Sequence, residues 1–229
     1  MTLETSFERQ SLKLANPFQI SRGTQTTAAN VVVTITDANG TTGIGGAAPS
    51  PHYGETVQTV MSVLPDLLAV VEAVGDPHAL VTIERQMQET ITNNPAARSA
   101  VSIALHDLAA KRLNVPLYRL WGLDPTTAPE TSFTIGLDST ERVKAKTAEA
   151  VAAGYHTLKI KLGTDRDREL IEAIRDVAPT VTLRVDANEA WTPKETVEKS
   201  VWLADHDVEF IEQPVPASNP EGLKFAYDH

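Results

Sequence analysis

The chain has 229 residues, of which 41% are hydrophobic and 22% are charged, which is the composition of a folded globular protein. It contains no cysteine, so disulfides, zinc–thiolate sites and thiol nucleophiles are excluded, and any metal must be bound by oxygen or imidazole. A formal net charge of -10 disfavours nucleic-acid binding, and no apolar run approaches the roughly 18 residues of a membrane span.

The N-terminal segment predicts an antiparallel sheet. Its first ten residues contain Glu4 and no basic region followed by an apolar stretch, so they do not resemble a secretory signal. We therefore expect a cytoplasmic protein without membrane contact. Residues 6–14 and 30–37 are β-rich, and Asn39-Gly40 between two such runs is a strong hairpin signal.

A helical region follows from residue 55 to about residue 122. Apolar residues recur there at spacings of three and four, as in Val57, Val60, Met61 and Leu64. Four prolines are expected to divide the region into separate helices: Pro65, Pro77, Pro95 and Pro116. Strands followed by helices predict an α+β domain over residues 1–128.

The glycine-rich segment 43–48 formally fits a dinucleotide-binding fingerprint, Gly-x-Gly-x-x-Ala. Such a fingerprint requires a strand before it and a helix that begins within it. Pro49 and Pro51 follow instead, so we expect no nucleotide cofactor to bind there.

After residue 128 the pattern changes to short β-rich runs that alternate with helical stretches. The predicted strands are residues 131–135, 157–161, 181–186 and 208–211, and the predicted helices are residues 141–153, 166–177 and 194–204. This series predicts an α/β domain over residues 129–229, built either as a (β/α) barrel or as an open doubly wound sheet. A complete barrel needs about 250 residues, so we expect the incomplete first half of a barrel, strands 1–4, in a truncated chain.

Charged side chains gather at the ends of three predicted strands. Lys159 and Lys161 are two residues apart and therefore point to one face, while the apolar residues beside them point to the other. Asp186 ends the next strand, with Asn188 two residues later, and Glu212 ends the strand after that. An unpaired buried ammonium group is costly, so we expect the carboxylates to lie beside the lysines.

This set of side chains suits one kind of chemistry. Carboxylates on neighbouring strand ends, without cysteine or a histidine pair, suit a hard cation such as Mg²⁺. A divalent ion stabilises the enediolate that forms when a proton α to a carboxylate is removed. A lysine near a metal and another cation has a lowered pKa and can act as the base.

Each motif also has a simpler interpretation. Lys-x-Lys alone is typical of a surface strand, an aspartate after a strand is typical of a helix N-cap, and Glu-Gln-Pro alone is typical of a turn. Their occurrence together, on successive strand ends, favours an active site.

The same motifs resemble those of the enolase superfamily, and within it the muconate-lactonizing subgroup. That pattern has Lys-x-Lys on the second barrel strand, Asp-Ala-Asn on the third and Glu-Gln-Pro on the fourth, as in residues 159–161, 186–188 and 212–214 here. Further resemblance runs through residues 104–111 and 116–122. The resemblance implies an enolase-like α+β capping domain followed by a modified (β/α)7β TIM-type barrel.

The resemblance also implies a role for each residue in an isomerase, either a racemase or epimerase or a cycloisomerase. Lys161 would be the base on one face of the substrate, and Lys159 would support it electrostatically. Asp186 and Glu212 would bind Mg²⁺, and Asn188 would support these ligands from behind.

Within the subgroup, the chain most resembles dipeptide epimerases that act on L-Ala-D/L-Glu-like substrates. Similar enzymes use an Arg and a Thr near residues 18–23 and 132–136 to hold the substrate, which makes Arg22 and Thr134 candidates for binding a small carboxylate such as a dipeptide. The simpler interpretations are that Arg22 is a surface charge and that Thr134 is present because threonine favours β-strands. One departure is Gly46, where relatives commonly have Glu.

The end of the chain limits these expectations. Relatives supply a third metal carboxylate, and a lysine on the opposite face of the substrate, from later strands that this sequence does not contain. We therefore expect this chain alone not to epimerise its substrate and to bind Mg²⁺ weakly. o-Succinylbenzoate synthase and muconate cycloisomerase share the same lysines and carboxylates and remain alternatives, as does a non-catalytic truncated remnant. Exposed strand edges would favour self-association, so a homo-oligomer is also open.

Overall fold

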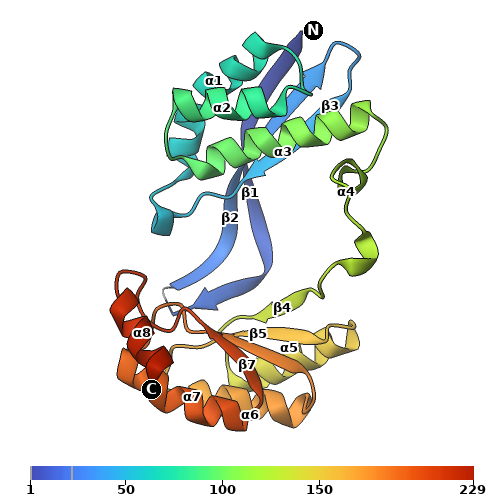
Figure 1. Cartoon of the computed structure of the whole chain (residues 1–229). Helices are drawn as coiled ribbons and strands as arrows, with labels where there is room; N and C mark the ends of the chain where they lie inside the picture. Colours follow the sequence, from blue (N-terminus) through green and yellow to red (C-terminus); the bar gives the residue numbers. More distant parts are fainter. Residues whose placement is uncertain (1, 22) are drawn as a thin grey trace. The chain divides into compact units, whose positions relative to one another are not determined.

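The computed structural model describes residues 2–21 and 23–229, so Arg22, a candidate substrate-binding residue, lies outside the described residues. The chain divides into two compact units. One comprises residues 1–14 and 27–128, and the other comprises residues 15–26 and 129–229. Strands precede helices in the first unit, and strands alternate with helices in the second, as the sequence predicts (Figure 1).

The first unit contains a three-stranded sheet in the order β1-β2-β3. β1 (Leu3–Ile20) and β2 (Gly23–Asp37) are longer than the predicted strands, and β2 pairs antiparallel with β3 (Thr42–Ala47). The predicted hairpin is confirmed. Asp37 stabilises it, because its Oδ1 accepts hydrogen bonds of 2.9 Å from the backbone N–H groups of Asn39 and Thr41.

The helices of the first unit pack against this sheet. They are α1 (Val57–Val74), α2 (Leu80–Thr90), α3 (Pro95–Arg112) and the short α4 (Leu117–Leu120), with 3-10 turns at Pro51–Tyr53 and Pro125–Thr127. Val31, Val33 and Ile35 alternate along β2 and are fully buried in the same core as the helices. This alternation buries one face of the strand, and the predicted α+β arrangement is confirmed.

Pro65 does not divide the first helix as predicted. It lies inside α1, at an exposed position. A proline inside a helix removes one backbone hydrogen bond, here to the carbonyl group of Met61, and water can satisfy that group near the surface. The other three prolines lie between helices or at helix starts, as predicted.

α1 is the one helix, within residues 2–21 and 23–229, whose length and apolar composition would allow it to cross a membrane. Val60, Leu64, Leu67 and Val71 are nevertheless fully buried in the core of the first unit. Thr56 and Thr59 form a capping box at the start of the helix. One apolar face against a core and a polar cap are typical of a helix in a globular domain.

α3 lies very close to β3. A Cβ atom added at Gly43 would lie 2.1 Å from the carbonyl oxygen of Ala104, and one added at Gly45 would lie 1.9 Å from that of Ala100. These distances are far shorter than van der Waals contact, so only glycine allows the approach. Packing of helix against strand therefore explains the glycine-rich segment.

The second unit is a parallel sheet with helices between its strands. The strands are β4 (Ser132–Ile135), β5 (Thr157–Lys161), β6 (Thr182–Asp186) and β7 (Val208–Glu212), and the helices are α5 (Thr140–Ala152), α6 (Asp167–Val177), α7 (Pro193–Asp205) and α8 (Pro220–Asp228). The strands lie in the order β4-β5-β6-β7, and α5, α6 and α7 cover one face (Figure 1).

This order distinguishes the two predicted architectures. A doubly wound sheet reverses its strand order and carries helices on both faces, whereas a barrel wall keeps each strand beside its neighbour in sequence. The described strands therefore have the arrangement of a (β/α) barrel wall, and the doubly wound alternative is wrong for them. β4 and β7 are the edges of the sheet, so these four strands do not form a closed barrel.

A single apolar layer holds the second unit together. Its buried members come from alternate positions of the strands and from the helix faces above them: Ile135, Leu158, Ile160, Leu183, Val185, Val143, Leu170, Ile171 and Ile174. The opposite face of β4, β5 and β6 is thus left to the polar residues of these strands, whereas on β7 the exposed Phe210 shares that face with Glu212.

Residues 15–26, at the end of β1 and the start of β2, belong to the second unit. The backbone N–H of Leu137 donates a 3.0 Å hydrogen bond to the carbonyl oxygen of Gln19. The Ser21 hydroxyl donates a 3.1 Å bond to the carbonyl oxygen of Asn188. This segment therefore reaches the carboxyl ends of β4 and β6.

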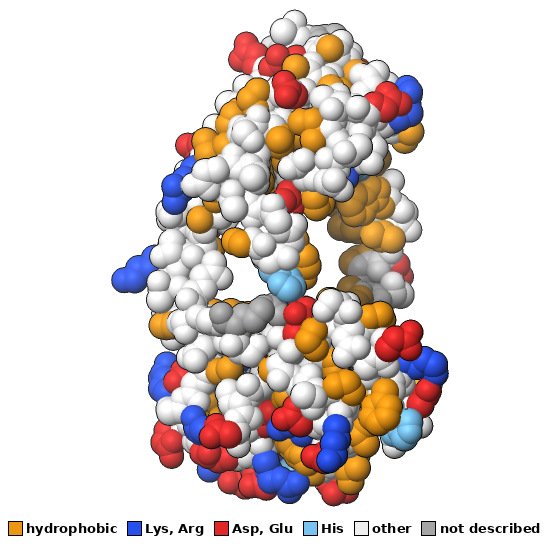
Figure 2. Space-filling view, turned by 90° about the vertical axis from the view of Figure 1, so that its left-hand side faces the viewer, with side chains coloured by type: hydrophobic (Ala, Val, Ile, Leu, Met, Phe, Trp, Pro, Cys, Tyr) orange, Lys and Arg blue, Asp and Glu red, His pale blue; other side chains and the backbone are white. Residues whose placement is uncertain are grey.

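Acidic and basic side chains are interspersed on the second unit, in the lower part of Figure 2. Several form surface ion pairs, such as Lys144 with Asp176 at 3.2 Å and Arg184 with Glu209 at 2.6 Å. Exposed pairs of this kind add little stability. The described residues form no continuous basic patch on the face in view (Figure 2).

Candidate active site

The two lysines of β5 point to the face of the sheet opposite the helices. Leu158 and Ile160, which alternate with them, are at most 1% exposed in the core under the helices. Lys161 is also buried, with 8% exposure, and Lys159 is partly buried. The predicted division of β5 between an apolar and a lysine-bearing face is therefore confirmed.

The carboxylates lie beside these lysines. The Nζ of Lys161 lies 2.6 Å from Oδ2 of Asp186, and the Nζ of Lys159 lies 3.2 Å from the same oxygen. The Nζ of Lys159 also lies 2.6 Å from Oε2 of Glu212. The structure thus brings together all four charged residues that the sequence analysis selected.

Strand register explains this grouping. Lys161 is the register partner of Asp186, which in turn is the partner of Glu212 on the edge strand β7. Parallel strands lie about 4.8 Å apart, so side chains at matched positions on one face can contact each other. The edge position of β7 also explains why the Glu212 side chain is 46% exposed, whereas that of Asp186 is 3% exposed.

Asp186 is held in its ionised form. Burial opposes its ionisation, but the hydrogen bond from Lys161, that from the backbone N–H of Asn188 and the contact with Lys159 together lower the pKa of Asp186. The Asn188 N–H lies 2.9 Å from Oδ1 of Asp186. Both carboxylate oxygens of Asp186 therefore have a donor.

Lys159 is held in its protonated form. Burial favours the neutral amine, but hydrogen bonds to Glu212 and Asp186 and the two negative charges raise the pKa of Lys159 above its ordinary value. The lowered lysine pKa that we expect concerns the base, Lys161, beside a bound metal, and it stays a prediction.

Asp186 and Glu212 are suited to form part of a binding site for a divalent cation. The Lys159 ammonium group contacts Asp186 and Glu212 at the same time, which shows that one cation can be shared by both carboxylates. Carboxylate oxygens are the ligands that Mg²⁺ prefers. Within residues 2–21 and 23–229 no group of three or more His, Asp or Glu side chains is arranged to hold a metal ion, so Asp186 and Glu212 are the two carboxylates that the described strand ends offer.

Asn188 supports the site through its backbone. Asn188 and Glu189 both have positive φ, 50° and 69°, in a left-handed turn that asparagine tolerates better than most residues. The turn aims the Asn188 N–H at Asp186, and the carbonyl group of Asn188 accepts the hydrogen bond from Ser21. The contribution of Asn188 shown by these contacts is therefore a main-chain one.

Thr134 lies on the same face as the lysines, because it is the register partner of Lys159 on β4. It also borders a hollow of about 280 Å³ at the edge of the sheet, whose aromatic lining includes Phe18, Phe133 and Tyr155. None of the four charged residues lines that hollow. Thr134 is thus near the lysines, on the side of β5 away from the carboxylates.

Sequence reasoning missed Asp167, which is 1% exposed at the start of α6. Its carboxylate accepts hydrogen bonds from the turn after β5 and from Trp191 in the loop after β6. The only signal in the sequence is an acidic residue at the start of a predicted helix, which ordinarily indicates a cap.

Comparison with known proteins agrees with this fold and site. Residues 3–122 match the model of the mandelate racemase / muconate lactonizing enzyme N-terminal domain, and residues 142–226 match that of the enolase C-terminal domain-like family. The first match alone covers more than half of the chain. The chain therefore belongs to the mandelate racemase / muconate lactonizing enzyme family of the enolase superfamily.

Among members of this family, the chain is similar to dipeptide epimerases. It is 39% identical to an L-Ala-D/L-Glu epimerase of Bacteroides thetaiotaomicron, over 93% of this chain and 55% of that protein. It is 34% identical to an L-Ala-D/L-Glu epimerase of Bacillus subtilis, over 99% of this chain and 63% of that protein. The chain spans between 55% and 64% of the length of these and similar curated relatives.

A solved structure shows the same similarity. The dipeptide epimerase from Enterococcus faecalis V583, complexed with Mg and the dipeptide L-Leu-L-Tyr, matches with a TM-score of 0.86 and 32% identity. The match covers 100% of this chain and 65% of that chain. The described chain is thus similar in fold to this enzyme.

Proposed function

We propose that the four charged residues form one wall of a Mg²⁺-dependent site that removes the proton α to a carboxylate, in an epimerase of dipeptides. The observation that carries the proposal is the geometry at the strand ends, where Lys161 contacts Asp186 and Lys159 contacts both Asp186 and Glu212. The similarity to L-Ala-D/L-Glu epimerases and to an epimerase bound to Mg and a dipeptide supports this substrate class.

Each residue would have a defined task. A Mg²⁺ ion held by Asp186 and Glu212 would offset the negative charge that develops on the substrate carboxylate. Lys161 is buried, and the Nζ of its neutral amine form would take the α-proton on one face of the substrate. Lys159 would keep a positive charge beside the reacting carboxylate, in agreement with its raised pKa.

Other residues would place the substrate and the ligands. We propose that Thr134, on the lysine-bearing face of the sheet, contacts the substrate, and that Asn188 holds Asp186 through its backbone. We assign Arg22 the same substrate-binding role on the basis of its position in the sequence alone. We further propose a capping domain over residues 1–128, a barrel-type domain over residues 129–229, a cytoplasmic location and a homo-oligomeric state.

Metal binding is the direct test. Mn²⁺ can replace Mg²⁺ as a paramagnetic probe, and electron paramagnetic resonance measures its free concentration. We expect the chain to bind Mn²⁺, Mg²⁺ to displace it, and Asp186→Asn and Glu212→Gln each to weaken binding at least tenfold. Glu209→Gln is the matched control, because Glu209 lies on the same strand and pairs with Arg184 instead of a lysine of β5.

Proton exchange tests the reaction. In ²H₂O with Mg²⁺ and L-Ala-L-Glu, proton nuclear magnetic resonance reports loss of the α-proton signal of the Glu residue. We expect any exchange to vanish in Lys161→Ala and to persist in Lys194→Ala, which removes an exposed lysine that pairs with Glu198 on α7. Mn²⁺ binding that is unchanged by both carboxylate substitutions, or exchange that persists without Lys161, would contradict the proposal.

A further inference from the structure

The Asp167 carboxylate is completely enclosed by donors. It accepts hydrogen bonds from five groups: the backbone N–H groups of Gly163 and Thr164, the Thr164 hydroxyl, the Trp191 indole and the Lys199 ammonium group. The two backbone bonds to Oδ1 measure 2.9 and 2.8 Å, and the two bonds to Oδ2, from Trp191 and Lys199, each measure 3.1 Å. Charge-assisted bonds of this kind are stronger than neutral ones.

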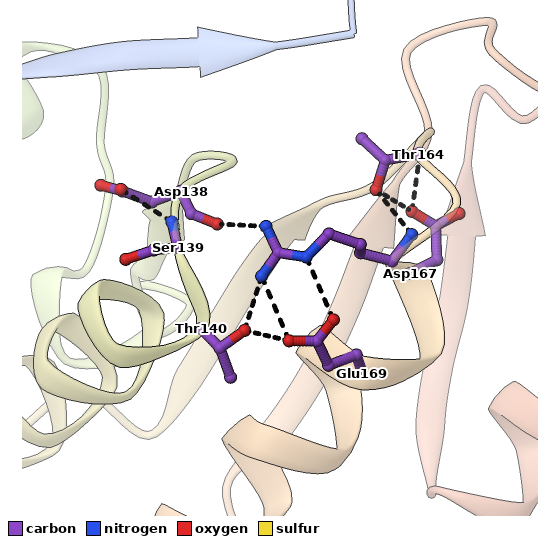
Figure 3. A network of polar contacts seen from close by, with 7 residues as sticks. Asp138, Ser139, Thr140, Thr164, Asp167 and Glu169 are labelled. Carbon is purple, nitrogen blue, oxygen red and sulfur yellow. Dashed lines mark hydrogen bonds and ion pairs between the residues drawn. The ribbon is translucent and has the colours of Figure 1, made fainter.

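These donors come from three different elements. Gly163 and Thr164 directly follow β5, Trp191 lies in the loop after β6, and Lys199 is on α7. Figure 3 shows Thr164 and Asp167 facing each other at the start of α6. One buried carboxylate therefore ties the segment just after Lys161 to the segment just after Asp186.

The two segments are also in direct contact. The Leu162 N–H donates a 3.0 Å bond to the Asp186 carbonyl oxygen. Gly163 has φ of 112°, and a Cβ atom there would lie 2.6 Å from Cβ of Ala190. The loops thus meet at a position where only glycine fits, so a shift of one loop must displace the other.

A simple helix cap does not account for these contacts. A capping side chain accepts hydrogen bonds from N–H groups in the first turn of its own helix. The Oδ1 of Asp167 instead accepts from residues that precede α6, and its Oδ2 accepts from Trp191 and Lys199, which are distant in the sequence. The N-cap position of α6 is Arg166, whose side chain makes no capping bond.

The loop after β4 and the start of α5 are attached to the same turn of α6, because Arg166 also donates a 3.4 Å hydrogen bond to the carbonyl oxygen of Asp138. The Arg166 guanidinium group donates to the Thr140 hydroxyl at 2.5 Å and to both carboxylate oxygens of Glu169. Thr140 in turn donates to Glu169, and the three labelled residues Thr140, Glu169 and Asp167 lie around one helix start (Figure 3). The start of α6 is therefore a junction for the loops that follow three strands.

We infer that Asp167 is a positioning residue that fixes the distance between Lys161 and Asp186. It acts through the backbone, because Gly163 lies two residues after Lys161 and Trp191 lies five residues after Asp186. The roles of Lys161 and Asp186 as base and metal ligand rest on the proposed function. In that function a small misplacement of either residue would strongly lower the rate of proton removal. The coupling of the two loops is a property of the fold and can be measured without metal or substrate.

Hydrogen exchange resolved by residue tests the coupling. Asp167→Asn keeps the shape but turns an NH₂ group toward donors, which leaves buried N–H groups without an acceptor. We expect at least tenfold faster exchange of the amides of Leu162, Gly163 and Thr164, and equally of Glu189 and Trp191, whose own partners are carbonyl groups of residues 213 and 214. The indole N–H resonance of Trp191 should also shift, and Trp191→Phe assigns it.

A matched control separates positioning from stability. Ile174→Ala removes a fully buried side chain of the same helix and lowers stability without touching Asp167. Urea is added to the more stable of the two variants until both have the same free energy of unfolding. Faster exchange confined to Gly163 and Thr164 in Asp167→Asn would overturn the inference, because Asp167 would then order its own turn only. Exchange equal to that of Ile174→Ala at every amide would overturn it as well.

Two further measurements keep the result clear. If Asp167→Asn does not fold, Trp191→Phe removes one donor and keeps an aromatic side chain, and it should speed exchange in residues 187–191 and, through Asp167, in residues 163 and 164; faster exchange in residues 187–191 alone would overturn the inference. The ammonium resonance of Lys161 reports its contact with Asp186 directly, and it should change in Asp167→Asn and not in Ile174→Ala. Failure of Mn²⁺ to bind would contradict the proposed function and leave these results unaffected.

Discussion

The Nζ of Lys161 lies 2.6 Å from Oδ2 of Asp186, and both residues are less than a tenth exposed. A buried ion pair of this kind contributes little net stability compared with apolar residues, but the loss of one partner leaves a buried charge without its counter-ion. Asp186 has a second cation, Lys159, at 3.2 Å. The two partners of the pair are therefore not equivalent.

The first prediction concerns this asymmetry. Asp186→Asn should destabilise the second unit by about 3 kcal/mol, because it removes the counter-ion of Lys161. Lys161→Met should cost less, because Asp186 keeps Lys159. The double variant should cost less than the sum of the two. Urea unfolding followed by tryptophan fluorescence measures these differences, and strictly additive losses would contradict a direct interaction.

The second prediction concerns pH. The pKa of Asp186 is lowered in the folded protein from an ordinary value of 3.8, so its ionised form stabilises the fold. That contribution is fully present above pH 3.8 and is lost as pH falls through the folded-state pKa. The difference in free energy of unfolding between the wild type and Asp186→Asn should therefore shrink as pH falls below 3.8. A difference that stays constant down to about pH 2 would contradict a stabilising contribution from ionised Asp186.

The third prediction concerns the approach of α3 to β3. Gly45→Ala would place a Cβ atom 1.9 Å from the Ala100 carbonyl oxygen, and overpacking of this kind costs about 1–3 kcal/mol or more. Gly46→Ala is the matched control on the same strand, because no atom lies within 4 Å of a Cβ atom there. Thermal unfolding should show a clear loss for Gly45→Ala and almost none for Gly46→Ala. Equal melting temperatures would show that the helix can move away at little cost.

The fourth prediction concerns competition between Lys159 and a metal. The Lys159 ammonium group contacts both carboxylates, so a divalent ion must displace it or share them with it. Lys159→Met should therefore tighten Mn²⁺ binding, by about tenfold for a change of about 1.4 kcal/mol. Lys194→Met, which removes an exposed lysine paired with Glu198, should leave the affinity unchanged. Weaker binding in Lys159→Met would indicate that this lysine organises the carboxylates instead of competing for them.

Local pattern was sufficient to predict much of this fold and site. The alternation of β5 assigns Lys159 and Lys161 to one face and Leu158 and Ile160 to the core, and the structure confirms both assignments. The position of Asp186 and Glu212 at strand ends was enough to place them near the lysines, because consecutive parallel strands bring matched positions together.

Other features depend on contacts that sequence spacing does not reveal. The sequence predicts a helix break at Pro65, but α1 continues through this proline because the position is exposed. Asp167 reads as a helix cap, and its bond to Trp191 joins residues far apart in the sequence. The packing of residues 15–26 with the second unit likewise depends on tertiary contacts, through Gln19 and Ser21.

The alternation of β5 has a consequence for how accurately the sheet assembles. If β5 paired with its neighbours one residue out of step, Lys159 and Lys161 would enter the apolar layer and Leu158 and Ile160 would leave it. Two ammonium groups buried without partners would cost several kcal/mol each, which would make the misaligned sheet unfavourable. The same two lysines, to which we assign a chemical role, thereby also disfavour the wrong register of β5 while the protein folds.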